Sequence, residues 1–185
     1  MSGLQLNEQV NYKGFHGKSI EQMPKLIAEG RTPLSVQGLM KRRLEVADSS
    51  NVSLRNSWLL HYFDTGDSVL YHPDGRVKVV LGYQLGRELN AESRLSDGAL
   101  ILPDGAYEAA YGQEFRMKDL VKQDLVVLLR RNEVLDHPVW MALARDDKLL
   151  EAYVDMVFNK GRELYGYNGV MGVILAHPQN VPTMR

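Results

Sequence analysis

The sequence predicts an α+β fold, in which an N-terminal helical pair and a helical C-terminal third flank a central antiparallel β-meander. Three observations support this prediction. Apolar residues have helical spacing near both ends, short runs rich in aromatic and β-branched residues fill the middle, and Pro-Asp-Gly turns separate those runs. We expect the helical third to pack on the apolar face of a sheet of four to six strands.

The composition is that of a folded globular domain. The chain has 185 residues, of which 44% are hydrophobic and 24% are charged, and it contains no cysteine. The length predicts a single domain over residues 1–185, and the missing cysteines exclude disulfides, thiolate zinc sites and cysteine nucleophiles. Neither a signal-peptide pattern nor an apolar run of about 20 residues is present, so we expect a soluble, cytoplasmic protein with no membrane partner.

The net charge of −1 hides an uneven distribution along the chain. Residues 1–47 hold seven Lys and Arg against four Asp and Glu, whereas residues 48–110 hold five against nine. Residues 111–185 hold ten of each sign. The sequence therefore predicts a basic helical head (1–47), an acidic β-hairpin region (48–115), and a neutral helical tail from residue 116 onward.

The basic head predicts two short helices. Ser19 is a suitable N-cap for a helix over residues 20–29, because its hydroxyl can accept a hydrogen bond from a first-turn backbone N–H. A second helix is predicted from Thr32-Pro33 to about Val46, since proline is favoured at helix starts and the following apolar residues have helical spacing.

The hairpin region predicts short strands separated by turns. Ser57–Phe63, Ser68–His72 and Arg76–Leu81 are rich in aromatic and β-branched residues, which favour strands. The Pro-Asp-Gly segment at residues 73–75 is a strong turn signal, so the second and third of these runs should form a hairpin.

A second Pro-Asp-Gly segment, at residues 103–105, predicts another hairpin between residues 99–102 and 106–111. Six identities at a spacing of thirty residues link the two units, which suggests a duplicated hairpin. The alternative is that a common turn tripeptide recurs by chance. The matching residues are Asp67, Leu70, Pro73, Asp74, Gly75 and Gly82 in the first unit, and Asp97, Leu100, Pro103, Asp104, Gly105 and Gly112 in the second.

The tail predicts helices and a closing strand. Residues 117–129 carry a helical stripe, although their last five residues also fit a buried strand, and periodicity alone does not decide between the two. Asp136 is predicted to cap a short helix. Residues 170–175 are predicted to form the closing strand, and residues 178–185 an irregular end.

The longest predicted helix begins at Asp146-Asp147 and ends at Gly161 or Gly166. Its apolar residues form a stripe along one face. We therefore expect this helix to cover the apolar face of the sheet.

The basic head gives the leading functional hypothesis, a small binding protein that contacts duplex nucleic acid. Two short helices joined by a glycine-containing turn are compatible with a helix-turn-helix, whose second helix enters the major groove. Its early polar residues would contact bases and its cations would contact phosphates. Alternatively, the basic helix end only complements the helix dipole. The candidate nucleic-acid-binding residues are Arg31, Ser35, Gln37, Lys41, Arg42 and Arg43.

The acidic region gives a second hypothesis, a metal-dependent hydrolase or nuclease. Two histidines and three aspartates lie within fourteen residues, where they could bind a divalent metal or place a base beside an acid. Alternatively, each aspartate is a turn former, and no metal-ligand spacing such as His-x3-His is present. The candidate catalytic or metal-ligating residues are His61, Asp64, Asp67, His72 and Asp74.

The third hypothesis is a structural or protein-interaction module that forms homo-oligomers through sheet edges or the tyrosine-rich tail. Gly166, Gly169 and Gly172 do not favour a phosphate-binding loop, because a helix precedes them and a strand follows, the reverse of the order that such loops need. The sequence contains no Gly-x-Ser-x-Gly nucleophile motif either. It therefore does not choose between an enzyme and a binding protein.

Overall fold

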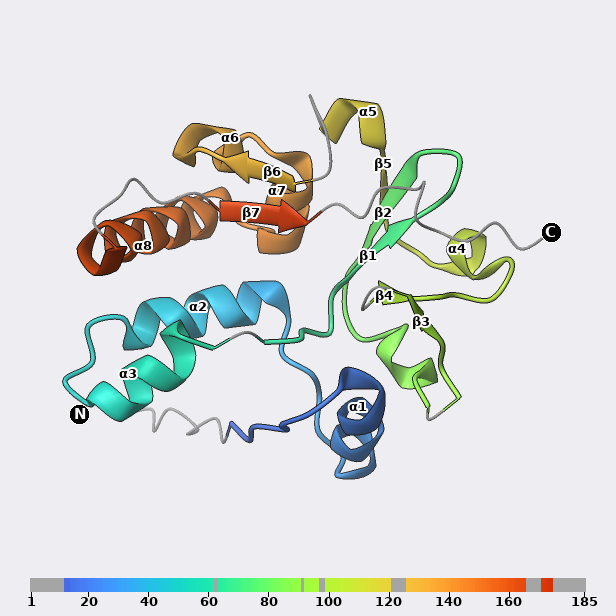
Figure 1. Cartoon of the computed structure of the whole chain (residues 1–185), viewed down its shortest axis with the longest axis horizontal. Coiled ribbons are helices and arrows are strands. Elements are labelled where there is room, and N and C mark those ends of the chain that lie inside the picture. The colour runs from blue at the N-terminus through green and yellow to red at the C-terminus, as the bar shows by residue number, and fades with distance from the viewer. Residues whose placement is uncertain are drawn as a thin grey trace, which may run out of the picture.

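The chain folds, as predicted, into an α+β architecture in which helices flank a small antiparallel sheet (Figure 1). The computed structural model describes residues 12–61, 63–90, 92–96, 99–120, 126–165 and 171–174. The helices are α1 (Ser19–Ala28), α2 (Val36–Val46), α3 (Val52–Leu59), α4 (Ala106–Ala109), α5 (Met117–Leu120), α6 (Arg131–Leu135), α7 (Pro138–Ala144) and α8 (Asp147–Tyr165), with the 3-10 helix η1 (Gly86–Glu88). The strands are β1 (Ser68–Tyr71), β2 (Arg76–Val80), β3 (Leu95–Ser96), β4 (Ala99–Leu100), β5 (Gln113–Arg116), β6 (Val126–Leu129) and β7 (Met171–Ile174).

The main sheet has three antiparallel strands in the order β1-β2-β5. The hairpin predicted around residues 73–75 is confirmed, with Leu70 of β1 opposite Lys78 of β2. Gly75 has a φ of 87°, which glycine adopts without the steric cost that other residues meet in this tight turn. The pairs β3–β4 and β6–β7 form separate two-stranded sheets, so the main sheet is smaller than the four to six strands expected.

The core forms around the central strand β2. Val77, Val79 and Val80 are at most 1% exposed, as is usual for a strand covered on both faces. Leu150 and Val154 of α8 are equally buried and belong to the same core as Val77 and Val79. Helix α7 packs on β2, and α8 packs on α2, α6 and α7. The helical third therefore packs on the sheet, and α8 shares the core with β2.

The two predicted head helices form, but they begin at other residues. Ser19 is the first residue of α1 and not its cap, and its hydroxyl donates to Asp64. Helix α2 begins at Val36, after Ser35, whose Oγ accepts from the backbone N–H of Gly38 at 3.0 Å. The two helices also have different main neighbours, because α1 packs mainly on η1 whereas α2 packs on α8, α3 and α7 (Figure 1).

The predicted strand over residues 57–63 is wrong, because its first part belongs to helix α3. Asn51 caps this helix by accepting from the backbone N–H of Leu54 at 3.0 Å. At the other end, Arg43 donates to two carbonyl groups of the last turn and the following segment. These caps at both ends outweigh the strand preference of the aromatic and apolar residues, which depends strongly on context.

The second Pro-Asp-Gly segment does not build a second hairpin. Gly105 precedes the short helix α4, so the strand predicted over residues 106–111 is wrong. The aligned glycines also differ: Gly82 has a φ of 78° and open space around it, whereas a Cβ on Gly112 would lie 2.3 Å from the carbonyl oxygen of Val79. The residues after 103–105 are therefore not a structural copy of the first hairpin.

The tail confirms its predicted strand and its longest helix. Residues 126–129 form β6, paired with β7, which decides the ambiguity of the 125–129 run and confirms the closing strand. Helix α8 begins after Asp146, whose Oδ1 accepts from the backbone N–H of Leu149 at 3.0 Å. Asp136 ends α6 and does not cap α7. The predictions for residues 121–125, Asp97, Gly166, Gly169 and 178–185 lie outside the described residues.

Candidate interaction surface around helix α3

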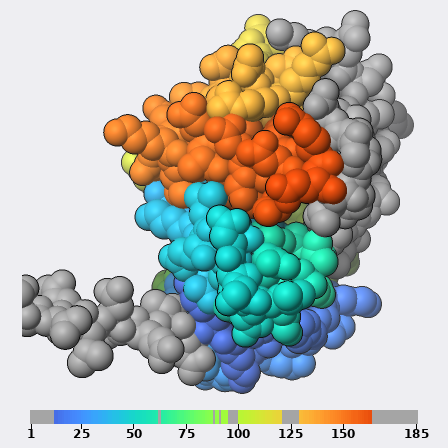
Figure 2. All heavy atoms as spheres, turned by 90° about the vertical axis from the view of Figure 1, so that its left-hand side faces the viewer, coloured from blue at the N-terminus to red at the C-terminus, as the bar shows by residue number. Residues whose placement is uncertain are grey.

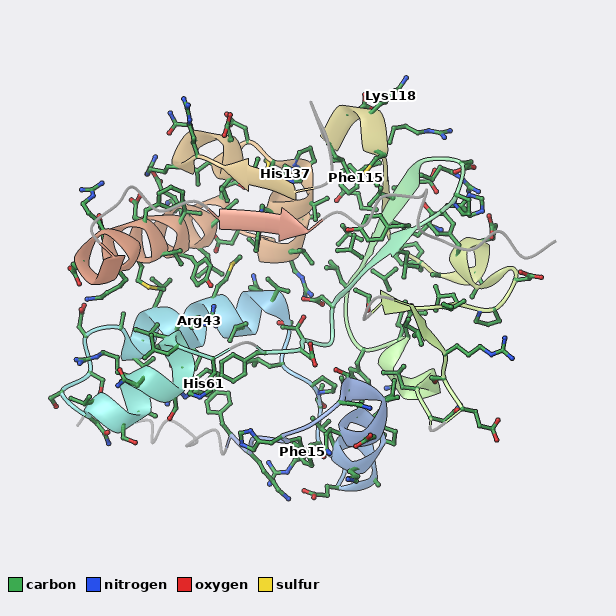
Figure 3. The ribbon with its side chains drawn as sticks, viewed as in Figure 1. Phe15, Arg43, His61, Phe115, Lys118 and His137 are labelled. Carbon is green, nitrogen blue, oxygen red and sulfur yellow. The ribbon has the colours of Figure 1, made fainter. Side chains whose placement is uncertain are left out.

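Arg43, a candidate for nucleic-acid binding, points into the molecule. Its guanidinium donates from Nε to the Trp58 carbonyl at 2.9 Å, from Nη2 to the His61 carbonyl at 2.8 Å, and from Nη1 to the Tyr153 hydroxyl at 2.7 Å. Figure 3 shows Arg43 between α2 and α3, and His61 beside the end of α3. These bonds satisfy carbonyls at the end of α3 and tie α2 to α8. Each of the three guanidinium nitrogens is therefore engaged in a hydrogen bond within the fold.

The other polar candidates on α2 have different roles. Ser35 is the N-cap of the helix, and Gln37 in the first turn is half-buried. Lys41 is exposed and has no ion-pair partner within the described part of the chain. Leu39 and Met40 of α2 are buried, and this helix packs on α8, α3 and α7.

Much of the head's remaining positive charge is paired locally. Glu29 accepts from Lys13 at 2.6 Å and from Arg31 at 3.3 Å, and the Lys13 hydrogen bond lowers the pKa of the Glu29 carboxyl. Arg42 donates to Glu45 at 3.0 Å, one helical turn further along α2. Lys13, Arg31 and Arg42 therefore each have an acidic partner within the head, and these pairs leave its excess of positive charge unchanged.

Aromatic rings gather beside α3. The Trp58 ring stacks on Phe63, with centroids 5.1 Å apart and planes 16° apart, and meets the Tyr12 ring edge-on at 5.0 Å. The Arg42 guanidinium lies 5.0 Å from the Tyr12 centroid and 5.4 Å from that of Trp58, and the Arg43 guanidinium lies 5.6 Å from that of Phe63. Such aromatic and cation–π contacts hold the rings in fixed positions.

The same region carries most of the exposed apolar side chains. Tyr12, Val52, Leu60 and Phe63 are 40%, 54%, 54% and 37% exposed, and they are four of the six large hydrophobic residues that are exposed among those described. No residue of α3 is buried, and Figure 2 shows this helix on the outer surface of the molecule. A gathered apolar patch indicates a binding surface, whereas single exposed residues are ordinary. We define Tyr12, Val52, Trp58, Leu60 and Phe63 as the α3 face.

Sequence reasoning missed this face because it assigned Trp58, Leu60 and Phe63 to a strand. Asn51 was the signal that could have revealed the helix, since asparagine before an apolar run is a typical N-cap. Sequence patterns could not predict that Tyr12 contacts Trp58, because the two residues lie far apart along the chain.

The five His and Asp candidates lie in several places. His61 is exposed after α3, with Nδ1 3.3 Å from the Asn56 carbonyl, and Asp64 binds the first residue of α1. His72 and Asp74 stay together at the hairpin turn, with 2.8 Å between Nδ1 and Oδ1. Within the described residues, no three His, Asp or Glu side chains are placed to hold a metal ion.

Asp67 is a buried hydrogen-bond acceptor that joins several elements of the fold. Its side chain is 0% exposed. Oδ2 accepts from the backbone N–H of Val36, and Oδ1 accepts from that of Gly82 and from Nη2 of Arg145, each at 2.7 Å. The carboxylate thus joins the start of α2 to the ends of β2 and α7. Both oxygens are satisfied, as a buried carboxylate requires.

Arg76 occupies the centre of the carboxylates around the hairpin. Its guanidinium lies 2.7 Å from Asp74, 2.9 Å from Glu108 and 3.8 Å from Glu114, and 4.9 Å from the Tyr107 ring centroid. Desolvation works to raise the pKa of Asp74, but hydrogen bonds from Arg76 hold it well below its usual range, and an Arg76 hydrogen bond also lowers the pKa of Glu108. The guanidinium thus fills the position that a metal ion would need among these carboxylates.

Two surface depressions lie near β5 and α5, and both are open to solvent. An enclosed pocket with a few convergent polar groups is what a small-molecule site normally requires. Lys118 projects outward from α5 and does not converge on a pocket (Figure 3). The first depression, about 530 Å³, is lined by Asp74, Gly75, Arg116, Met117 and Lys118. The second, about 320 Å³, is lined by Glu114, Phe115, Arg116, Asp119, Leu120 and Pro138.

Comparison with known proteins adds no candidate function: no family model matches the chain, and neither a curated protein nor a solved structure matches it. None of the described helices is both long and apolar enough to cross a membrane. The α3 face, identified from its own chemistry, is therefore the strongest candidate functional surface.

Proposed function

We propose that this chain is a binding protein, without enzymatic activity, that docks a protein partner through the α3 face. The observation that carries the proposal is that the exposed rings of Tyr12 and Phe63 contact Trp58 of α3, while Val52 and Leu60 at the two ends of this helix are also exposed. Tryptophan, tyrosine and arginine are the residues most enriched at the energetic centres of protein interfaces. Trp58 and Arg42 supply two of these types at the same place.

The rigidity of the surface supports the same proposal. Asn51 fixes the start of α3, and the guanidinium of Arg43 fixes its end through the carbonyls of Trp58 and His61. A surface that is already ordered before binding loses less conformational entropy when the partner docks, so a small apolar patch can still bind.

A photo-crosslinking amino acid at position 60 tests the proposal in cells of the source organism. Met141 on α7 is the matched control position, since it is exposed to a similar degree but lies outside the α3 face. We expect protein adducts, identified by mass spectrometry, from position 60 and not from position 141. Adducts of equal yield from both positions, or none from position 60, would contradict the proposal.

Nucleic-acid binding is a second candidate, favoured by the exposure of Lys41 and by the stacking of Arg42 on two aromatic rings. Proteins that bind nucleic acid combine phosphate-neutralising cations with aromatic and arginine contacts of this kind. In this proposal α2 contacts the phosphates of duplex DNA from outside the groove. Arg43 takes no part, because its guanidinium is held inside the fold.

Fluorescence anisotropy with duplex DNA at several salt concentrations tests this second candidate. Lys41→Ala should flatten the slope of log affinity against log salt by about 0.9, the value for one lost phosphate contact. Lys148→Ala, an exposed lysine on α8, is the control and should leave the slope unchanged. Equal slopes for all three proteins would rule out phosphate contact by Lys41.

A further inference from the structure

We propose that the outer edge of strand β5 pairs with β5 of a second copy of this chain, antiparallel and centred on Phe115. Figure 1 shows β5 well away from α3, so the inference concerns a different surface and does not rest on the proposed function. A two-fold contact requires a surface that is complementary to itself. An antiparallel strand pair meets this requirement when the strand sequence is complementary about its own centre.

The outer edge of β5 presents backbone groups that a further strand can bind. β5 is the last strand in the order β1-β2-β5, and the N–H of Met117 at its end donates to the carbonyl of Gly75 at 2.8 Å. An antiparallel ladder bonds alternate residues of a strand. Phe115 therefore faces β2 in the same way, whereas Glu114 and Arg116 point their N–H and C=O groups outward. Within the described residues these outward groups have no backbone partner.

The same edge is open to solvent. Glu114, Phe115 and Arg116 line the second depression and no residue of β2 does, so the depression follows the side of β5 away from β2. Glu114 and Arg116 are exposed and Phe115 is half-buried. An exposed edge strand is a template for pairing with another chain, because its backbone groups are already aligned.

Arg116 lacks a carboxylate partner in the single chain. Across the ladder it lies directly opposite Arg76, and it has no ion pair among the described residues. Arg76 is compensated by Asp74 at 2.7 Å and Glu108 at 2.9 Å. Like charges directly opposite each other destabilise a sheet, so a carboxylate on the outer side of Arg116 would stabilise β5.

A second copy supplies that carboxylate in register. When two β5 strands pair about Phe115, Glu114 of each copy lies opposite Arg116 of the other, and the outward backbone groups of these residues meet as hydrogen-bonded pairs. A register centred on Glu114 or on Arg116 would place like charges opposite each other at its centre. The alternation Glu114-Phe115-Arg116 therefore selects the proposed register.

The neighbouring charges allow this contact, but its size makes it weak. Lys118 and Asp119 of α5, which line the depressions beside β5, carry opposite charges and add no net repulsion between copies. β5 has only four residues, so the contact is much smaller than the interface of a stable complex. We expect a dissociation constant on the order of 100 µM or weaker.

Sedimentation equilibrium of the full chain, at concentrations on both sides of that dissociation constant, tests the inference through charge reversal. Glu114→Arg and Arg116→Glu each place like charges opposite each other, and each should weaken dimerisation by about tenfold. The double variant Glu114→Arg/Arg116→Glu restores opposite charges and should dimerise like the wild type. An equimolar mixture of the two single variants should form a heterodimer, because every arginine then meets a glutamate.

Lys148→Glu, a charge reversal at an exposed residue of α8, is the control and should dimerise like the wild type. Circular dichroism checks that each variant is folded before its mass is interpreted. A wild type that stays monomeric throughout would overturn the inference, as would single variants that dimerise as tightly as the wild type. A mixture of the single variants that associates no better than either variant alone would also overturn it.

Discussion

The two arginine centres of the molecule use the same guanidinium in different ways. Arg43, in the basic head, donates to two backbone carbonyls and to the hydroxyl of Tyr153, and it holds three helices together. Arg76, in the acidic hairpin, binds carboxylates beside an exposed turn. Exposed ion pairs are weakened by water and salt, whereas hydrogen bonds of a half-buried guanidinium are not replaced easily. The burial of an arginine and the kind of acceptor it binds thus affect its contribution to stability more than the number of charges around it does.

Asp67 connects the two regions, and its loss should have the largest effect. Asp67→Ala leaves the N–H groups of Val36 and Gly82 and the guanidinium of Arg145 without their common acceptor. We expect the free energy of unfolding, measured in urea, to fall by about 2–4 kcal/mol, because two backbone N–H groups and a partly exposed guanidinium lose their acceptor. Asp64→Ala, at an exposed carboxylate, is the control, and equal losses in both variants would show that the burial of Asp67 is unimportant.

Arg43→Ala sharpens the comparison within the head. Removing three hydrogen bonds from a charged donor should lower the free energy of unfolding by about 2–3 kcal/mol. Amide hydrogen exchange in α3 should also become faster, because the end of that helix loses its cap. Lys41→Ala, two residues away and exposed, should stay within about 0.5 kcal/mol of the wild type. Unchanged exchange in α3 would contradict the capping role of Arg43.

His137 is a third basic residue to compare with Arg43 and Arg76, and it is buried. Within the described part of the chain neither ring nitrogen forms a hydrogen bond, and burial lowers the pKa of the imidazole, against a weaker opposite influence of the Leu120 backbone. As the pH falls, His137 is therefore protonated at a higher pH in the unfolded chain than in the folded one. Stability should be constant above the unfolded pKa of about 6.5 and should fall as the pH drops below it.

Urea unfolding from about pH 7 to about pH 5 measures this dependence, around the unfolded histidine pKa. His137→Leu should give a flatter pH profile than the wild type, because the buried group that takes up the proton on unfolding is gone. His16→Leu replaces an exposed histidine and should keep the wild-type profile. The same slope in wild type and His137→Leu would assign the pH dependence to other groups.

Arg76→Ala should have the smallest effect, because the ion pairs of Arg76 are exposed. The folded pKa values of Asp74 and Glu108 lie below their ordinary values, so these carboxylates stabilise the fold above about pH 4 and lose that contribution as the pH falls through their folded pKa values. Without Arg76 those values rise, and the midpoint of acid unfolding should move to higher pH.

Salt provides the check on this last prediction. The difference in acid midpoint between wild type and Arg76→Ala should shrink as salt is added, because exposed charges are screened. Arg116→Ala, at an exposed arginine of β5 without an ion pair among the described residues, should show little shift at any salt concentration. A shift that is independent of salt would indicate a buried role for Arg76.

The regular elements that the sequence predicted correctly depend on signals within a few residues. Gly75 follows Pro-Asp and precedes valines, so turn and strand signals agree, and the hairpin forms as expected. Asp146 likewise precedes an apolar stripe and accepts from Leu149. In contrast, the aromatic residues after Asn51 favoured a strand, although the structure places a helix there.

The candidate sites were less predictable, because a sequence shows which residues are charged but not what they contact. Arg43 and Lys41 look equivalent in the sequence, yet one is held by three acceptors and the other faces solvent. The candidate aspartates differ from one another in the same way. The side chain of Asp67 is buried among hydrogen-bond donors, whereas Asp64 is exposed.

The sequence by itself determined the α+β class, the first hairpin, the long final helix and the chemistry that the missing cysteines exclude. These features follow from composition, turn residues and caps, whose interactions lie close together along the chain. Only the tertiary structure decided that residues 126–129 form a strand, that the end of α3 is held by Arg43, and that Tyr12 joins Trp58 and Phe63 in one exposed face. Each of these depends on contacts between residues far apart in the chain, which no local pattern contains.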